Sequence, residues 1–193
     1  MRKITFGLNS RLYKLFRSCA ILLVLCSTGY AQERAWKTFS PPGGAWSIFA
    51  PGAMRADAEA EKPDSDKGSY SYYDFNGFFA VIYRDSPKRL VPWKPNYKAY
   101  FKKIRKDAVE AAKGQLLKEE DFTVGGASGR EVYIKVPSGT LIGTEGQVIT
   151  KYRVERLRMF FREKRFYLLV AVLPEADINS PEVNNFFNSF VVK

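Results

Sequence analysis

The chain has 193 residues, of which 31 are basic, 20 are acidic and none is histidine, which gives a formal net charge of +11. This length, with 46% hydrophobic residues, is typical of one globular domain. The absence of histidine excludes Ser-His-Asp and Cys-His centres, a histidine general base and every histidine-ligated metal site. Carboxylate, Lys, Tyr or Ser/Lys chemistry, or binding without catalysis, remains, so the sequence does not reveal a specific activity.

The first 31 residues have the order of a secretory signal peptide. They contain five basic residues and no acidic one, followed by the apolar run Cys19–Cys26 and then by small and polar residues up to Ala31. Gly29 and Ala31 supply the small side chains that a signal peptidase requires, which places the first residue of the processed chain near Gln32. We therefore predict that residues 1–31 are a signal peptide and that the protein is exported, to the periplasm or the medium.

Two alternatives to cleavage stay open. An uncleaved anchor would have to use residues up to Tyr30, because the apolar run alone is shorter than the roughly 20 residues that span a bilayer. A lipoprotein signal would make Cys26 the lipid-anchored N-terminus, although the bulky Leu25 stands where a small residue is usual.

Cleavage would change the composition of the domain. It removes five basic residues and so lowers the net charge from +11 to +6. It also removes both cysteines, Cys19 and Cys26, so residues 32–193 have no disulfide, no cysteine nucleophile and no cysteine metal ligand. We predict that residues 32–193 form a single domain stabilised by its core.

The first half of this domain has strand patterns. Two short strands are expected around the turn at 40–44, the second beginning at Trp46, and residues 54–61 are expected to form an exposed edge strand before a polar loop at 62–68. Residues 69–75 and 78–84 flank Asn76-Gly77, which favours a hairpin because both residues readily adopt positive φ.

A loop at 86–95 is followed by an amphipathic helix, with Asn96 as its N-cap and Gly114 as its stop. Strands are then expected at 115–124 and 130–136, around a turn at 125–129, and at 147–162 and 165–173.

The end of the chain predicts how the layers are arranged. The strand Phe166–Leu173 is apolar on both faces, which indicates a central position with cover on each side. Ser180 and Pro181 begin a closing helix with a phenylalanine-rich buried face. The predicted fold class is α+β: an antiparallel sheet of six to eight strands covered by helices.

The order of these sequence features resembles that of a group of uncharacterised exported bacterial domains. The resemblance is carried by Trp36-x-x-Phe39, Trp46–Phe49 before Pro51, Gly129–Val132 and the ending Phe186–Phe190. The fold of that group looks like the PsbP protein of photosystem II and the Ran-binding Mog1 protein, so the resemblance implies a PsbP/Mog1-like α/β/α sandwich and an accessory binding role. It transfers no functional residue, because the chain has no histidine for a PsbP-like metal site and no stretch that matches a Ran-contacting motif.

The short motifs considered for catalysis, calcium binding and phosphate binding do not meet the requirements of those sites. Gly126–Arg130 has an arginine where a nucleophile elbow needs its last glycine, and no Ser-x-x-Lys pair follows the signal segment. Asp64–Gly68 begins like a calcium loop but has no closing glutamate. The glycines at 139, 143 and 146 are too dispersed to bind a phosphate. We predict no cofactor and no metal site.

Basic residues are the only marked bias. Lys98, Lys102 and Lys106 follow one face of the predicted helix, and Arg156, Arg158 and Arg162 share a strand face with Phe160. These are either solvated faces or a patch for an anionic partner, such as lipid headgroups or an acidic protein. For the patch hypothesis the arginine strand is the preferred candidate, because guanidinium groups beside an aromatic ring suit planar anions. Nucleic acid is not expected for an exported domain.

The sequence thus predicts an exported, non-enzymatic binding or accessory module that contacts a protein or an envelope component, with peripheral membrane contact left open. The alternative is a hydrolase or transferase with a carboxylate-based active site, which would require two acidic side chains that converge in a cleft between the helix and the sheet. Glu119 and Asp121 share a strand face, but no second acidic cluster has an evident reason to meet them. A purely structural envelope role is a third possibility that the sequence does not separate from the first.

Overall fold

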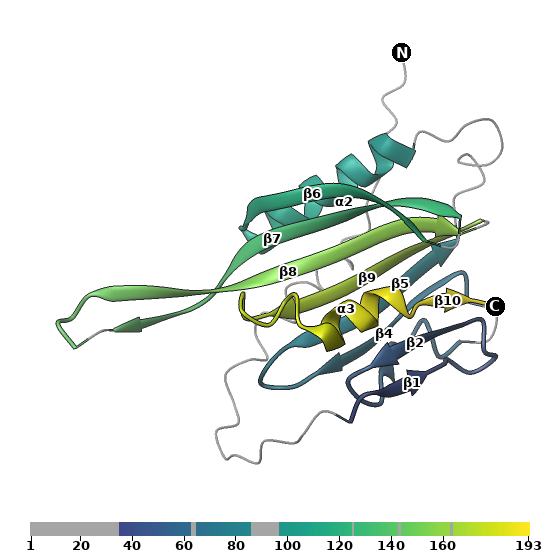
Figure 1. Cartoon of the computed structure of the whole chain (residues 1–193), viewed down its shortest axis with the longest axis horizontal. Coiled ribbons are helices and arrows are strands. Elements are labelled where there is room, and N and C mark those ends of the chain that lie inside the picture. Colours follow the sequence, from purple (N-terminus) through teal and green to yellow (C-terminus); the bar gives the residue numbers. More distant parts are fainter. Residues whose placement is uncertain (1–34, 63–64, 86–96, 125, 143, 163) are drawn as a thin grey trace.

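A seven-stranded antiparallel sheet forms the centre of the computed structural model, which describes residues 35–62, 65–85, 97–124, 126–142, 144–162 and 164–193. The strand order across this sheet is β3 (Arg55–Ala56), β4 (Lys67–Tyr73), β5 (Phe78–Asp85), β9 (Arg165–Leu173), β8 (Val148–Arg162), β7 (Ala127–Ile142) and β6 (Gln115–Val124) (Figure 1). The predicted antiparallel sheet of six to eight strands is confirmed.

Strand β9 lies in the middle of this sheet, between β5 and β8. Leu169 and Ala171 point into one apolar core, and Leu168 and Val170 point into the other, because successive side chains of a strand alternate between faces. The prediction of a central strand covered on both sides is therefore confirmed.

Helix α2 (Tyr97–Ala112) covers one face of the sheet (Figure 1). Its buried residues Phe101 and Ala108 pack with Phe161 and Leu157 of β8. The helix ends through Lys113, which has a φ of 48°, and through a hydrogen bond from the Gly114 N–H to the Val109 carbonyl. Gly114 is required by close packing, since a Cβ there would lie 2.6 Å from Cγ2 of Ile134.

The other face is covered by helix α3 (Pro181–Asn188) and by a small sheet of order β1 (Lys37–Phe39), β2 (Trp46–Ala50) and β10 (Val191–Val192). The side chain of Ser180 caps α3 by accepting a hydrogen bond from the Val183 N–H, as the sequence predicts. The core of this layer is aromatic, with Trp46, Phe186 and Phe187 fully buried. β10 has only two residues and no pattern that distinguishes it in the sequence.

The expected edge strand at 54–61 is wrong in length. Only Arg55 and Ala56 pair with β4. The carboxylate of Asp57 then accepts hydrogen bonds from the Ala60 N–H and from the Ser69 hydroxyl, and these two bonds hold the chain in a turn. The alternation of small and charged residues in this segment predicted a strand, but the hydrogen bonds of the Asp57 side chain form a turn there instead.

The hairpin at Asn76-Gly77 is confirmed, but its expected mechanism is wrong. Neither residue has a positive φ. The Asp74 carboxylate instead accepts hydrogen bonds from the N–H groups of Asn76 and Gly77, each at 2.8 Å. Gly77 is needed because a Cβ at this position would lie 2.7 Å from Cδ2 of Leu173 and 2.8 Å from the carbonyl oxygen of Val172.

Strand β7 is longer than predicted at both ends. Val124 pairs with Ala127, so residues 127–129 belong to the strand, not to the turn expected at 125–129. At the other end β7 continues to Ile142, which pairs with Val148 of β8.

Several predictions concern residues outside the described part of the chain. They are the signal segment 1–31 with the lipid-anchor alternative at Cys26, the loop at 86–95, the N-cap at Asn96 and the Asp64 position of the calcium-like loop. The single domain over 32–193 also stays a prediction. None of the helices in the described ranges has the length and the apolar character needed to span a membrane.

Candidate functional site

The arginine strand proposed for an anionic partner lies under helix α3. Arg156, Arg158 and Phe160 point from β8 toward this helix, and their exposed fractions are 4%, 6% and 2%. Of the four predicted residues, only Arg162 is exposed.

The two buried guanidinium groups share one carboxylate. Arg156 Nε donates to Glu131 Oε1 at 2.6 Å, and Arg158 Nη2 lies 3.2 Å from both oxygens of Glu131. Glu131 comes from β7, directly opposite Arg158 in the register, and is itself buried. The cluster therefore has one negative and two positive charges.

Helix α3 supplies further acceptors for these cations. Arg156 Nη1 donates to Asn184 Oδ1 at 2.7 Å, and Arg158 Nη1 donates to the carbonyl oxygen of Phe187 at 2.8 Å and to Asn188 Oδ1 at 2.9 Å. The Arg156 guanidinium also lies 4.4 Å from the centre of the Phe187 ring. Arg158 Nε is the one buried side-chain polar atom of the described residues without a hydrogen bond.

These contacts assign the arginines a clear structural role, because they join α3 to β7 and β8. Binding of an anionic partner by Arg156, Arg158, Phe160 and Arg162 stays a prediction, and it would require α3 to move away from the sheet. A spacing of two along a strand identifies a shared face, but it does not show whether another element covers that face.

The carboxylates considered for a hydrolase are paired with arginines or buried apart from one another: Glu119 and Asp121 share a strand face, as predicted, but both pair with Arg130. Glu131 is paired with two arginines on the α3 face. Glu155 is 4% exposed and lies on the α2 face, and burial raises its pKa to about 7. Glu119 forms ion pairs with Arg105 and Arg130, at the outer strand of the sheet. The described residues include no group of three or more acidic, cysteine or histidine side chains that could hold a metal ion.

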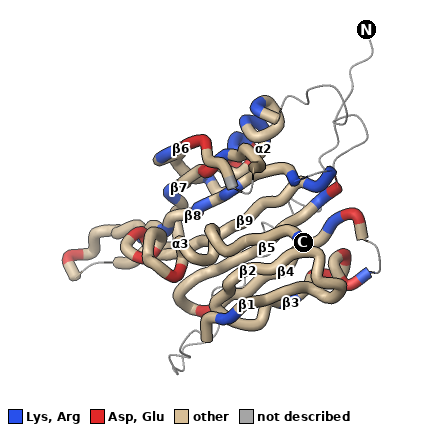
Figure 2. Tube along the Cα trace, turned by 45° about the vertical axis from the view of Figure 1, so that its right-hand side comes forward, with Lys and Arg blue, Asp and Glu red and all other residues tan. Residues whose placement is uncertain are grey.

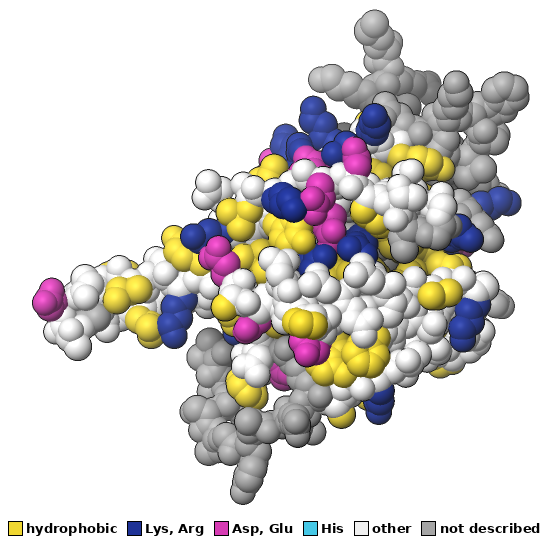
Figure 3. All heavy atoms as spheres, in the orientation of Figure 1, with side chains coloured by type: hydrophobic (Ala, Val, Ile, Leu, Met, Phe, Trp, Pro, Cys, Tyr) yellow, Lys and Arg dark blue, Asp and Glu magenta, His cyan; other side chains and the backbone are white. Residues whose placement is uncertain are grey.

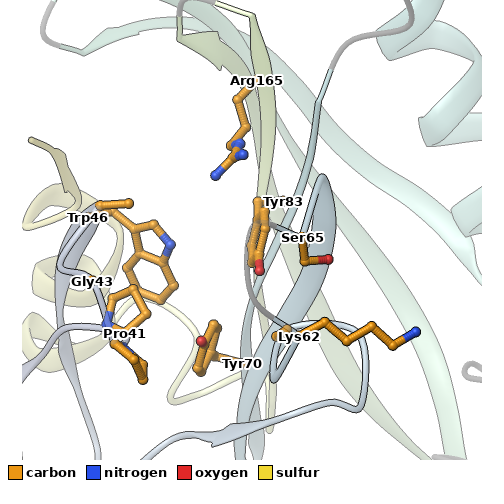
Figure 4. Close-up of a pocket in the computed structure, with 11 residues that line it drawn as sticks. Pro41, Gly43, Trp46, Lys62, Ser65, Tyr70, Tyr83 and Arg165 are labelled. Carbon is orange, nitrogen blue, oxygen red and sulfur yellow. The ribbon is translucent and has the colours of Figure 1, made fainter.

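A pocket of about 400 Å³ opens on the α3 side of the sheet, between the β1–β2 turn and strands β4, β5 and β9 (Figure 4). Pro41 and Trp46 form one wall, and Tyr70 and Tyr83 form the other. Arg165 lies at its upper border, where its Nε donates to Asp85 Oδ1 and its guanidinium stands 5.0 Å from the centre of the Tyr83 ring. Sequence reasoning did not find this pocket, because its residues come from four separate segments.

The pocket tyrosines are protonated donors at neutral pH. Burial is the main cause of the raised pKa of both Tyr70 and Tyr83. The carboxylates of Asp57 and Glu61 raise the pKa of Tyr70 further, whereas Arg165 partly offsets the rise at Tyr83. Ionisation of either hydroxyl therefore requires a more alkaline pH than usual.

Strands β7 and β8 continue beyond the sheet as a projecting two-stranded arm, residues 137–142 and 148–152 (Figure 1). Pairing with β6 ends at Lys135 and pairing with β9 ends at Val154, so within the described residues both edges of the arm are unpaired. Every described residue of the arm is exposed.

The arm is apolar on both faces. Leu141 lies opposite Ile149, and Ile142 lies opposite Val148. Ile142 and Val148 are 81% and 72% exposed, and the hydrophobic side chains are visible along the arm in Figure 3. Glu145 lies in the connecting turn and Lys151 in the arm itself, whereas several other basic residues lie along α2 (Figure 2).

The comparisons with known proteins identify the fold and no more. No protein-family model matches the chain, and no curated protein matches it in sequence. Among solved structures, the cyanobacterial PsbP protein of Synechocystis sp. PCC 6803 is similar over 88% of this chain and 99% of its own, with 13% identity and a TM-score of 0.54. The Ran-binding protein Mog1p of Saccharomyces cerevisiae is similar over 82% and 96% of the two chains, with 12% identity and a TM-score of 0.49. The similarity to the PsbP protein shows that the chain has a PsbP-like α+β fold, as the resemblance in its sequence implied.

Proposed function

We propose that residues 32–193 act as an exported, non-enzymatic binding or accessory module that makes surface contacts with a protein of the envelope. Export is supported by the signal-like order of residues 1–31. The fold adds no activity of its own, because one scaffold hosts many functions.

The β7–β8 arm carries the proposal. Side chains such as Ile142 and Val148 cost free energy in water, roughly 25 cal/mol for each Å² of apolar surface. An isolated two-stranded ribbon is at best marginally stable, so the arm gains little by projecting unless another surface covers it. Its base is fixed, since Arg153 donates to the carbonyl oxygen of Phe75 at 3.1 Å.

A protein fits the arm better than the interior of a lipid bilayer. The turn at its tip contains Thr144, Glu145 and Gln147, and a carboxylate there would have to enter the hydrocarbon first. Both edges of the arm offer backbone N–H and carbonyl groups, which a strand of a partner protein can pair with while its side chains cover the aliphatic faces.

The experiment places a photoreactive amino acid at position 142 and cross-links the protein in the envelope of its source cells. We expect a cross-linked product that contains a protein, and we expect that product to disappear in the Leu141→Asp/Val148→Asp variant. The matched control is Leu117→Asp/Val191→Asp, which changes two exposed aliphatic side chains away from the arm, 47% and 53% exposed, and should leave the product unchanged. Cross-links to lipid alone, or equal yields from both variants, would refute a protein contact through the arm.

A further inference from the structure

The pocket shown in Figure 4 presents hydrogen-bond donors that no described residue uses. The ring N–H of Trp46 and the hydroxyls of Tyr70 and Tyr83 have no hydrogen-bond partner in the described part of the chain. As whole residues they are 1%, 5% and 7% exposed, but their polar atoms are not themselves buried, because Arg158 Nε is the one buried side-chain polar atom of the described residues without a hydrogen bond. The three donors therefore face the open pocket, where a ligand can reach them.

The unpartnered groups lie around one space. In Figure 4 the indole nitrogen of Trp46 and the guanidinium of Arg165 point toward the region beside Tyr83, and the hydroxyl of Tyr70 lies below it. The polar ends of Lys62 and Ser65 point away from this region. Only the Nε of Arg165 is used by Asp85, so its terminal N–H groups remain available to a ligand.

The side chains around this space are mainly hydrogen-bond donors. An indole N–H, two protonated phenols and a guanidinium all donate. Two of the carboxylates nearby are already engaged, Asp85 with Arg165 and Asp57 with Ser69 and the Ala60 N–H, and the third, that of Glu61, is exposed to solvent. A ligand that fills the space must therefore bring acceptors.

The apolar walls of the pocket and the charges around it restrict the class of ligand further. The rings of Pro41, Trp46 and Tyr70 provide apolar surface for a hydrophobic body, and about 400 Å³ is within the usual range for small-molecule sites. One guanidinium, with Asp85 and Asp57 close by, suits a single negative charge better than a dianion.

We infer that this pocket binds a small organic monocarboxylate with an apolar body, whose carboxylate accepts hydrogen bonds from Arg165, Tyr83 and Trp46. This inference goes beyond the proposed function, because it concerns a surface separate from the β7–β8 arm and a small ligand in place of a protein.

The test titrates the purified protein with benzoate, with its neutral isostere benzamide and with inorganic phosphate. Binding is followed by calorimetry and by the indole N–H resonance of Trp46, which is assigned with a Trp46→Phe variant. We expect benzoate to bind and to shift this resonance, and we expect benzamide and phosphate to bind at least about tenfold more weakly.

Two variants test the donors, and one serves as the control. Arg165→Met is expected to lower the affinity for benzoate about tenfold or more, and Tyr83→Phe about three- to tenfold, since hydrogen bonds to a charged group are stronger than neutral ones. Tyr83→Phe removes one oxygen and keeps the ring, so a loss of affinity with unchanged thermal unfolding reports on the pocket itself. Lys62→Met, whose amine points away, should bind as the wild type does.

Three results would overturn the inference. They are an indole resonance that does not move at about 50 mM benzoate, equal affinity for benzamide, and full affinity in both Arg165→Met and Tyr83→Phe. Preferred binding of phosphate would show an oxyanion site of a different class and would equally refute the monocarboxylate.

Discussion

Glu155 is a buried acid on the α2 face of the sheet, opposite Ile134 on β7 and Val172 on β9. Desolvation raises its pKa from 4.5 to about 7. Between these two pH values the folded chain keeps a proton that the unfolded chain has released. The stability that depends on this proton is therefore fully present below pH 4.5, and the free energy of unfolding falls as the pH rises to about 7.

We predict that Glu155→Gln removes this pH dependence. The variant should gain roughly 3 kcal/mol over the wild type between pH 4.5 and pH 8, because a shift of one pKa unit corresponds to about 1.4 kcal/mol. Urea unfolding at pH 4, 6 and 8 measures the difference. A difference between the two proteins that stays constant across this range would contradict the prediction.

Glu131 is the single counter-charge of two buried arginines, Arg156 and Arg158. Glu131→Gln leaves both guanidinium groups under α3 without a carboxylate, and removing one partner of a buried ion pair costs about 3–5 kcal/mol. We expect a loss of this size in the free energy of unfolding. Glu110→Gln, which breaks the exposed pair with Lys106, is the control and should cost less than about 1 kcal/mol. Equal losses would refute the structural role of the cluster.

At the scale of an element, the β4–β5 hairpin depends on close packing and on Asp74 more than on left-handed backbone. Gly77→Ala should destabilise the protein by about 1–3 kcal/mol, because its Cβ would meet Leu173 and the Val172 carbonyl. Asn76→Ala should have little effect, since Asn76 has no positive φ and contributes only its N–H to the turn.

Thermal unfolding of the two single variants decides between the two explanations of this turn. A turn with positive φ at both positions would instead make Asn76→Ala clearly destabilising.

At the scale of the whole molecule, the projecting arm is separate from both cores. We predict that replacing residues 137–152 by Asn-Gly, between the paired residues Val136 and Arg153, leaves the free energy of unfolding within about 1 kcal/mol of the wild type. The reason is that the described residues of the arm are all exposed. Chemical denaturation and the near-ultraviolet circular dichroism spectrum measure the result. A large loss of stability would show that the arm belongs to the core.

The same deletion separates the two proposals. It should abolish the cross-linked protein product and leave benzoate binding unchanged, because the pocket lies between the β1–β2 turn and β4, β5 and β9. If it abolished both, the pocket and the arm would be parts of one binding surface.

The sequence by itself determined the class of fold and the position of its strongest elements. The doubly apolar run Phe166–Leu173 could only be stable in the middle of a covered sheet, and the Ser180-Pro181 pair defined the start of α3 through local hydrogen bonding. Alternation also placed Arg156, Arg158 and Phe160 on one strand face. These properties depend on neighbours along the chain, which a sequence displays directly.

Only the tertiary structure decided what those faces contact. Helix α3 covers the arginine face. Glu131, which precedes Arg156 by 25 residues in the chain, neutralises part of the positive charge on that face. The pocket joins Trp46, Tyr70, Tyr83 and Arg165 from separate segments, and β7 and β8 extend past their neighbours because their pairing partners end first. Burial, ion pairing and the free edges of strands are properties of contacts between distant segments, so no local pattern determines them.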